Sequence, residues 1–250
     1  MNTLNMVMSA NDSTVVAEYK PIDAKSDAYQ SEADLENEFI RILTSMKYEY
    51  LKINSEDDLI NNLRLQLEKL NKFQFTDSEW KRFFTKYIAN SNDDIAAKTK
   101  KIQESDSVQA FTKDNGETQN IKLIDKKNIH NNFLQVINQY EENNGNYENR
   151  YDVTILVNGL PLVHVELKRR GVAIREAFNQ IKRYQRDSFW ASSGLYQYVQ
   201  IFIISNGTHT KYYSNTTRES HIKEMNSQRN KTRKTSNSFK FTSYWADAKN

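Results

Sequence analysis

The feature that most constrains this chain is an apolar β-hairpin that carries charged residues. An Asn-Gly pair, which is typical of a tight hairpin turn, separates two runs with strand character, residues 151–157 and 160–168. Asp152 lies near the start of the first run, whereas Glu166 and Lys168 lie at the end of the second. All three charges therefore fall at the same end of the hairpin, where burial is costly unless something compensates them.

The register of this hairpin decides whether the two carboxylates meet. A strict two-residue turn pairs Val157 with Leu160 and sends Asp152 and Glu166 to opposite faces. An odd-numbered loop or a bulge, for example one that pairs Val157 with Pro161, places Asp152 directly across from Glu166 with Cβ atoms about 5 Å apart. If the carboxylates act together, we therefore expect a bulged or odd-numbered connection.

Two facing carboxylates repel each other and are compatible when a hard divalent cation lies between them. Mg²⁺ takes one or two protein carboxylates, together with waters and substrate phosphate oxygens. Lys168 is two residues from Glu166 and shares its strand face, so its ammonium group could orient a water or stabilise negative charge. These groups suit phosphodiester hydrolysis. An edge hairpin with one surface salt bridge remains the alternative from spacing alone.

Composition excludes several other kinds of site. The 250 residues contain no cysteine, which removes disulfides, thiolate zinc sites and thiol nucleophiles. The histidines lack metal-ligand spacing; His164 lies on the Glu166 face, where strand packing is the favoured interpretation. No phosphate-binding Gly-x-x-x-x-Gly-Lys-Ser/Thr motif occurs. No apolar run reaches the roughly 18 residues of a membrane span, and no signal peptide is evident, so we expect a cytoplasmic protein without a membrane partner.

The local patterns predict helices first and a β-rich region later. Polar capping residues at 31, 55 and 76 each precede an apolar face with helical spacing. A further short helix is expected within residues 92–101. The later predicted elements are strands at 133–140, 151–157, 160–168, 198–205 and 208–214, with a helix at 172–187. The order predicts an α/β fold with a small mixed sheet flanked by helices and preceded by a helical elaboration.

An Asp followed by Glu-Leu-Lys on a hairpin, then by a helix and an apolar strand, resembles the core of the PD-(D/E)XK nucleases. Further motifs occur in the same order over roughly residues 28–248. They are the acidic helix start at 31–36, Asn149-Arg150-Tyr151-Asp152, Gln180-x-x-x-Tyr184, Ile204-Ser205-Asn206-Gly207, and Phe239-x-Phe241 with Trp245. This ordered set resembles the N-terminal nuclease region of the R (restriction and translocation) subunit of type I restriction-modification enzymes.

The resemblance implies roles for the charged hairpin residues. Asp152 and Glu166 would be ligands of Mg²⁺, the Leu167 carbonyl could add a ligand, and Lys168 would be the catalytic lysine. One departure is that the residue before Asp152 is tyrosine rather than proline.

Three further residues are expected to support the site. Gln180 and Tyr184 lie four apart on one helical face and match the family's Gln-x-x-x-Tyr element, with a role in supporting DNA or the catalytic lysine. Ordinary helix packing is the alternative for Tyr184. Glu36, with Glu38 as a second candidate, would be the helical glutamate that some relatives bring to the site.

The charge distribution points to a phosphate-facing surface in the second half. The net charge of +3 is too small to indicate a nucleic-acid binder by itself. Basic residues nevertheless form three clusters, at 168–170, 182–186 and 229–234, although each cluster alone also fits a solvated helix face. The expected contacts to DNA phosphates are Lys182, Arg183, Arg186, Arg169 and Arg170.

The resemblance also implies the wider function and the domain boundaries. We expect Mg²⁺-dependent cleavage of double-stranded DNA, with specificity and methylation subunits as partners and ATP used only by motor domains outside this chain. The expected domains are a flexible arm at 1–30, an endonuclease domain at 31–214 (helical part 31–103, nuclease core about 130–214), and a basic linker with an aromatic segment at 215–250. Two alternatives stay open: a non-catalytic docking module that joins the motor to its partner subunits, and a stand-alone repair or resolvase nuclease.

Overall fold

The computed structural model describes residues 30–104, 108–215, 239 and 242–245, and the backbone of two N-terminal strands. These strands, β1 (Asn5–Ser9) and β2 (Val15–Glu18), pair antiparallel. The rest of the arm expected at 1–30, and most of the segment expected at 215–250, lie outside the described residues.

The three predicted capping residues begin helices as expected. They start α1 (Glu32–Ser45), α2 (Glu56–Asn71) and α3 (Asp77–Phe83). Each hydroxyl accepts a hydrogen bond from the backbone N–H three residues later, which satisfies one of the otherwise unpaired donors of the first turn. The caps of α1 and α3 are complete capping boxes.

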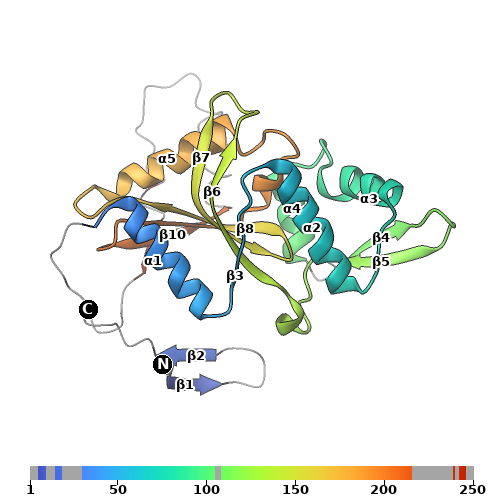
Figure 1. Ribbon diagram of the computed structural model, residues 1–250, viewed down its shortest axis with the longest axis horizontal. Coiled ribbons are helices and arrows are strands. Elements are labelled where there is room, and N and C mark those ends of the chain that lie inside the picture. Colours follow the sequence, from blue (N-terminus) through green and yellow to red (C-terminus); the bar gives the residue numbers. More distant parts are fainter. Residues whose placement is uncertain are drawn as a thin grey trace.

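A small lobe of helices and one hairpin forms one end of the molecule (Figure 1). Helix α3 continues into a π-helical turn, η1 (Phe84–Ile88), which precedes α4 (Ile95–Gln103). Strands β4 (Val108–Thr112) and β5 (Thr118–Lys122) form a separate antiparallel hairpin. The sequence analysis did not predict this hairpin, because its strands are polar and exposed at alternate positions.

A seven-stranded mixed sheet forms the centre of the molecule, in the order β11-β10-β9-β8-β7-β6-β3. Its strands are β3 (Glu49–Tyr50), β6 (Leu134–Glu142), β7 (Asn149–Val157), β8 (Leu160–Leu167), β9 (Ile201–Ser205), β10 (Thr210–Ser214) and β11 (Ser243–Trp245). Only the β3–β6 and β8–β9 pairs are parallel. The crossover from β8 to β9 contains α5 (Ile174–Asp187) and a 3₁₀ turn, η3 (Leu195–Tyr198); another 3₁₀ turn, η2 (Ile129–Asn131), precedes β6. The predicted mixed sheet flanked by helices is confirmed, and it takes one strand from beyond residue 214.

Two apolar clusters cover the two faces of this sheet. The smaller cluster lies under α1 and consists of Leu43, Val136, Val153, Val165 and Leu167. The larger cluster joins α2, α5 and the lobe to the other face. Both faces are therefore closed by helices. Among the described residues, no helix combines the length and the apolar character needed to cross a bilayer.

The β7–β8 hairpin combines a two-residue turn with a bulge. Val157 pairs with Leu160, so the example pairing of Val157 with Pro161 is wrong. The register then shifts by one residue, so that Val153 pairs with Val165. The expectation of a bulged or odd-numbered connection is confirmed in its bulged form.

Candidate active site

The bulge brings Asp152 and Glu166 to the same position along the hairpin. Because Val153 pairs with Val165, the next residues outward are Asp152 and Glu166. Asp152 Oδ2 accepts a hydrogen bond of 2.8 Å from the Leu167 N–H, which fixes the aspartate against β8. The Glu166 side chain is fully buried, and its Oε2 has no hydrogen-bond partner.

Lys168 bends back onto the same oxygen atoms. Its Nζ lies 3.1 Å from Glu166 Oε1 and 3.0 Å from the Leu167 carbonyl oxygen. Its backbone N–H donates to the Ser205 carbonyl at 2.8 Å, which holds the lysine on β9 as well as β8. The parallel β8–β9 pairing therefore sets the position of the ammonium group.

The environment of the two carboxylates favours their neutral forms. Burial raises the pKa of Asp152 to about 7, and the nearby Glu166 carboxylate adds to the rise. Burial also raises the pKa of Glu166 to about 7, although Lys168 opposes this. Burial would lower the pKa of Lys168, but the surrounding carboxylates raise it above its ordinary value. Lys168 alone therefore does not compensate the negative charge of the Asp152–Glu166 pair.

His164 lies in an aromatic shell beneath the carboxylates. Its ring is fully buried and has edge contacts with Tyr151 and Phe189. Burial lowers the pKa of His164 to about 4, so the imidazole is neutral at pH 7. Its Nε2 is 3.5 Å from Glu166 Oε2, and neither ring nitrogen has a hydrogen-bond partner among the described residues. These contacts agree with the packing role expected from the sequence.

The donors at this end of the hairpin fit Mg²⁺ as a partial ligand set. Among the residues that the structure describes, no group of three or more His, Asp or Glu side chains is arranged to hold a metal ion. The hairpin offers the carboxylates of Asp152 and Glu166 and the Leu167 carbonyl, all oxygen atoms. Mg²⁺ usually takes one or two protein carboxylates and completes its shell with waters and substrate oxygens. The partnerless, buried Glu166 Oε2 is the feature that a cation would satisfy.

Helix α1 reaches the site through a residue that the sequence analysis did not select. Glu32 Oε1 accepts a 3.3 Å hydrogen bond from the Arg169 N–H, and its Oε2 is 3.7 Å from Lys168 Nζ. Glu36, one turn later, is buried and accepts hydrogen bonds from the side-chain amides of Asn138 and Gln139 on β6. The available signal was the four-residue spacing of these glutamates, which places both on one helical face.

The other glutamate considered on α1 is occupied at the surface. Glu38 Oε1 forms an ion pair with Arg41 Nη2 at 2.6 Å. Glu38 therefore lies outside the group of residues that surrounds Lys168.

Gln180 and Tyr184 meet on α5 as their spacing predicts. The Gln180 amide donates to the Tyr184 hydroxyl oxygen, and this hydroxyl donates to the Arg150 carbonyl at 2.9 Å. The Tyr184 ring also packs against Tyr151, with centroids 4.9 Å apart. The two residues thus join α5 to the start of β7, directly before Asp152.

The five basic residues expected to contact DNA differ in their surroundings. Lys182 and Arg183 are exposed and form no hydrogen bond or ion pair with another residue of the described chain. Arg186 is exposed but makes two hydrogen bonds to the Asp187 carboxylate, at 2.7 and 3.0 Å. Arg169 is exposed beside Lys168, and Arg170 is half-buried. Lys182 and Arg183 therefore have the most freely available charge on α5.

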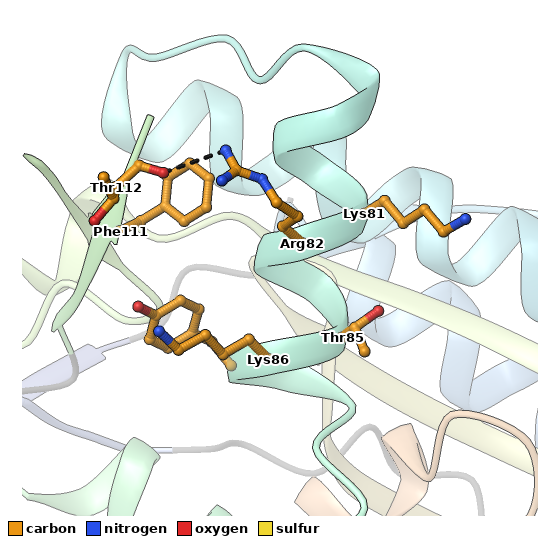
Figure 2. Close-up of a pocket in the computed structure, with 7 residues that line it drawn as sticks. Lys81, Arg82, Thr85, Lys86, Phe111 and Thr112 are labelled. Atoms are coloured by element: carbon orange, nitrogen blue, oxygen red, sulfur yellow. Dashed lines mark hydrogen bonds between the residues drawn. The ribbon is translucent and has the colours of Figure 1, made fainter. Parts of the chain in front are cut away.

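A cavity of about 460 Å³ lies elsewhere, between the η1 turn and the β4–β5 hairpin of the lobe. Figure 2 shows Arg82 and Lys86 projecting toward the hairpin that carries Phe111 and Thr112. The lining contains basic, hydroxyl and aromatic side chains but no carboxylate. The residues that line it include no carboxylate or imidazole for a metal ion, so we place the candidate active site at the β7–β8 hairpin.

The mixed sheet and the Asp…Glu-x-Lys hairpin define an α/β protein with a restriction-endonuclease-like fold. The family model described as "Type I restriction enzyme R protein N terminus" matches residues 29–221. The chain belongs to this family, as its ordered motifs indicated.

Proteins named as endonuclease subunits are similar to this chain. The EcoprrI type I restriction enzyme endonuclease subunit of Escherichia coli is 44% identical over 245 residues, which are 98% of this chain and 73% of that protein. The SauMSSORF170P endonuclease subunit of Staphylococcus aureus strain MSSA476 is 42% identical over 193 residues, 75% of this chain but only 20% of that protein. A putative subunit of Methanocaldococcus jannaschii, MjaIXP, is 38% identical over 112 residues, 42% of this chain and 10% of that protein. The chain thus matches a small part of the longer relatives.

Proposed function

We propose that this chain is the nuclease region of a type I restriction enzyme R subunit and that it hydrolyses phosphodiester bonds of double-stranded DNA with Mg²⁺. The observation that carries the proposal is the convergence of Asp152, Glu166 and Lys168 at one end of a bulged hairpin. The names of the relatives, which describe endonuclease subunits, support the same reaction.

Each hairpin residue has a distinct role in this proposal. Asp152, Glu166 and the Leu167 carbonyl would hold the ion, which would activate water and offset negative charge at the phosphate. Lys168 would then share its two present acceptors, Glu166 and the Leu167 carbonyl, with the ion. Its ammonium group is free to orient the attacking water or to stabilise charge on the phosphate.

The supporting residues act through the scaffold. The Gln180–Tyr184 pair holds the backbone before Asp152 by its bond to the Arg150 carbonyl. Glu36 fixes α1 on β6, so that the first turn of α1 stays beside Lys168.

DNA is held mainly through its phosphates, which carry no sequence information. Lys182, Arg183, Arg186, Arg169 and Arg170 supply these contacts, and a separate specificity subunit recognises the site. Methylation subunits complete the complex in the cytoplasm, and ATP is used by motor domains outside this chain. In this proposal the nuclease region extends over residues 31–214.

Lys168→Ala tests the proposal in the R subunit assembled with its partner subunits. We expect DNA cleavage to fall about 10²- to 10³-fold, the usual effect of removing one group that stabilises charge in the transition state, while ATP hydrolysis is kept. Lys127→Ala, which removes an exposed lysine, is the matched control and keeps both activities. Cleavage retained in Lys168→Ala would contradict the catalytic assignment and favour the docking module.

A further inference from the structure

The tip that joins β6 to β7, residues 143–148, is fixed against the end of α5 (Figure 1). The Asn146 N–H donates to the Asp187 carbonyl at 2.8 Å, and the Asn144 amide donates to the Ser192 hydroxyl at 2.8 Å. Gly145 lies so close that a Cβ atom there would be 2.4 Å from the Asp187 carbonyl oxygen. A side chain at position 145 would clash with the backbone of Asp187, so the tip packs closely against the end of α5.

Two large aromatic side chains beside this contact are exposed to solvent. Tyr147 is 66% exposed and Trp190 is 47% exposed. The Trp190 indole N–H donates to the Arg186 carbonyl at 2.8 Å. Tyr147 directly follows Asn146, whose N–H donates to the Asp187 carbonyl. The two aromatics thus belong to segments that contact the same end of α5.

A basic helix face continues from these aromatics. Arg186 is four residues after Lys182 and three after Arg183, so it adjoins both of them on the surface of α5. Asp187 forms an ion pair with Arg186, whereas Lys182 and Arg183 form no ion pair of that kind within the described part of the chain. The surface therefore changes along α5 from exposed basic side chains to exposed aromatic rings.

The aromatic tip is close to the carboxylates along the chain. Tyr147 precedes Asp152 by five residues, which limits their separation to about 17 Å at 3.3–3.4 Å per residue. Successive base pairs of a duplex are about 3.4 Å apart, so this reach corresponds to about five base pairs. A duplex held at the carboxylates therefore extends within reach of Tyr147.

We propose that Tyr147, with Trp190 at the same end of α5, makes an apolar contact with sugars and base edges of the DNA duplex beside the cleavage position. This inference rests on the proposed function, because it takes the same DNA as the bound molecule. Aromatic rings contribute to DNA binding by packing against sugars and bases rather than by neutralising phosphates. The contact adds affinity without releasing counterions, whereas Lys182 and Arg183 act on phosphates.

The test measures the Kd of the full chain for a short duplex at several salt concentrations, without Mg²⁺ so that no cleavage occurs. We expect Tyr147→Ala to raise Kd about 5- to 150-fold at every salt concentration and to leave the slope of log Kd against log salt unchanged. Tyr147→Trp should keep most of the affinity. Arg183→Ala should instead lower the slope by about 0.9.

The matched control is Trp245→Ala, which removes an equally exposed aromatic ring from the β11 edge of the sheet. It should leave both Kd and slope unchanged. An unchanged Kd in Tyr147→Ala, or a slope change like that of Arg183→Ala, overturns the inference while the nuclease proposal stands on the separate Lys168→Ala result. A wild-type chain that binds no duplex also overturns the inference, while DNA as the substrate is decided by cleavage in the assembled complex.

Discussion

Asp152 lies opposite Glu166 because β8 contains one residue more than β7 between the turn and the carboxylates. The turn pairs Val157 with Leu160, whereas Ile155 pairs with Val163, so Leu162 is the extra residue. Without this bulge, the alternation of side chains would place the carboxylates on opposite faces of the sheet. The site therefore depends on one inserted residue about midway along the strand.

Asp152→Asn should both weaken Mg²⁺ binding and stabilise the metal-free chain. The amide keeps the size of the side chain and removes a buried charge that repels Glu166. We expect a higher urea midpoint than wild type at pH 8 without divalent ions, and a lower affinity for Mg²⁺ by calorimetry. A lower midpoint would show that the contacts of the Asp152 carboxylate stabilise the fold more than its repulsion from Glu166 destabilises it.

The stability of the metal-free chain should fall as pH rises from about 4 to about 7. In the unfolded chain the two carboxyls lose their protons near pH 4, whereas in the folded chain the pKa values of Asp152 and Glu166 are about 7. Between these values the folded state binds more protons, so the free energy of unfolding decreases with pH. Urea titrations at pH 5 and pH 8, with a chelator, measure this loss.

The double variant Asp152→Asn, Glu166→Gln is the control for that pH dependence, because it has neither group to titrate. Its loss of stability between pH 5 and pH 8 should be smaller than that of wild type. An equal loss in both proteins would assign the pH dependence to other groups.

Glu32→Gln and Glu36→Gln should separate positioning of the lysine from stability of the fold. Glu32 is half exposed and contacts Lys168 at 3.7 Å, so its substitution should change stability by less than about 1 kcal/mol. Glu36 is buried and holds two amides, so its substitution should cost about 1.5–3 kcal/mol. Denaturation reports these differences.

Cleavage by the assembled complex then reports the role of Glu32. We expect Glu32→Gln to reduce the rate because Lys168 loses the negative charge that lies 3.7 Å from its Nζ. Glu32→Asp, which keeps the charge, should recover part of the rate. Full activity in Glu32→Gln would exclude this role.

Gly159→Ala should destabilise the hairpin more than Gly116→Ala. Both glycines have positive φ, +82° and +85°, which an alanine adopts only with strain. At Gly159 the new Cβ would also lie 2.5 Å from Leu63 Cα on α2, whereas at Gly116 nothing lies within 4 Å. We expect an additional loss of about 1–3 kcal/mol at Gly159, measured by urea unfolding. Equal losses of stability in the two variants would mean that backbone strain alone, without the contact to Leu63, sets the cost of the alanine.

Replacing Lys182 and Arg183 together by alanine should flatten the salt dependence of DNA binding. Each phosphate contact contributes about 0.9 to the slope of log Kd against log salt, so the slope should fall by about 1.8. Arg186→Ala should have a smaller effect, because Asp187 already pairs with that arginine. An unchanged slope in the double variant would remove both residues from the DNA contact surface.

The helix starts and the Asn-Gly turn could be predicted because their causes are local. Ser31 and Thr76 satisfy N–H groups three residues away, and this needs no contact with the rest of the chain. The β4–β5 strands escaped prediction because only Phe111 and Ile121 are buried in them. Two buried residues give no reliable period.

The sequence also determined the candidate site: Asp152, Glu166 and Lys168 occur in an apolar hairpin, where buried charge is costly unless it is compensated. It could not place the bulge at Leu162, because a bulge follows from the packing of strand pairs rather than from the residue itself. It could not distinguish Glu32 from Glu36, since both share one face of α1. Only the tertiary structure shows which glutamate reaches the lysine. The packing of α1 against β6 brings Glu32, in the first turn of the helix, to Lys168, and it places Glu36, in the second turn, against Asn138 and Gln139.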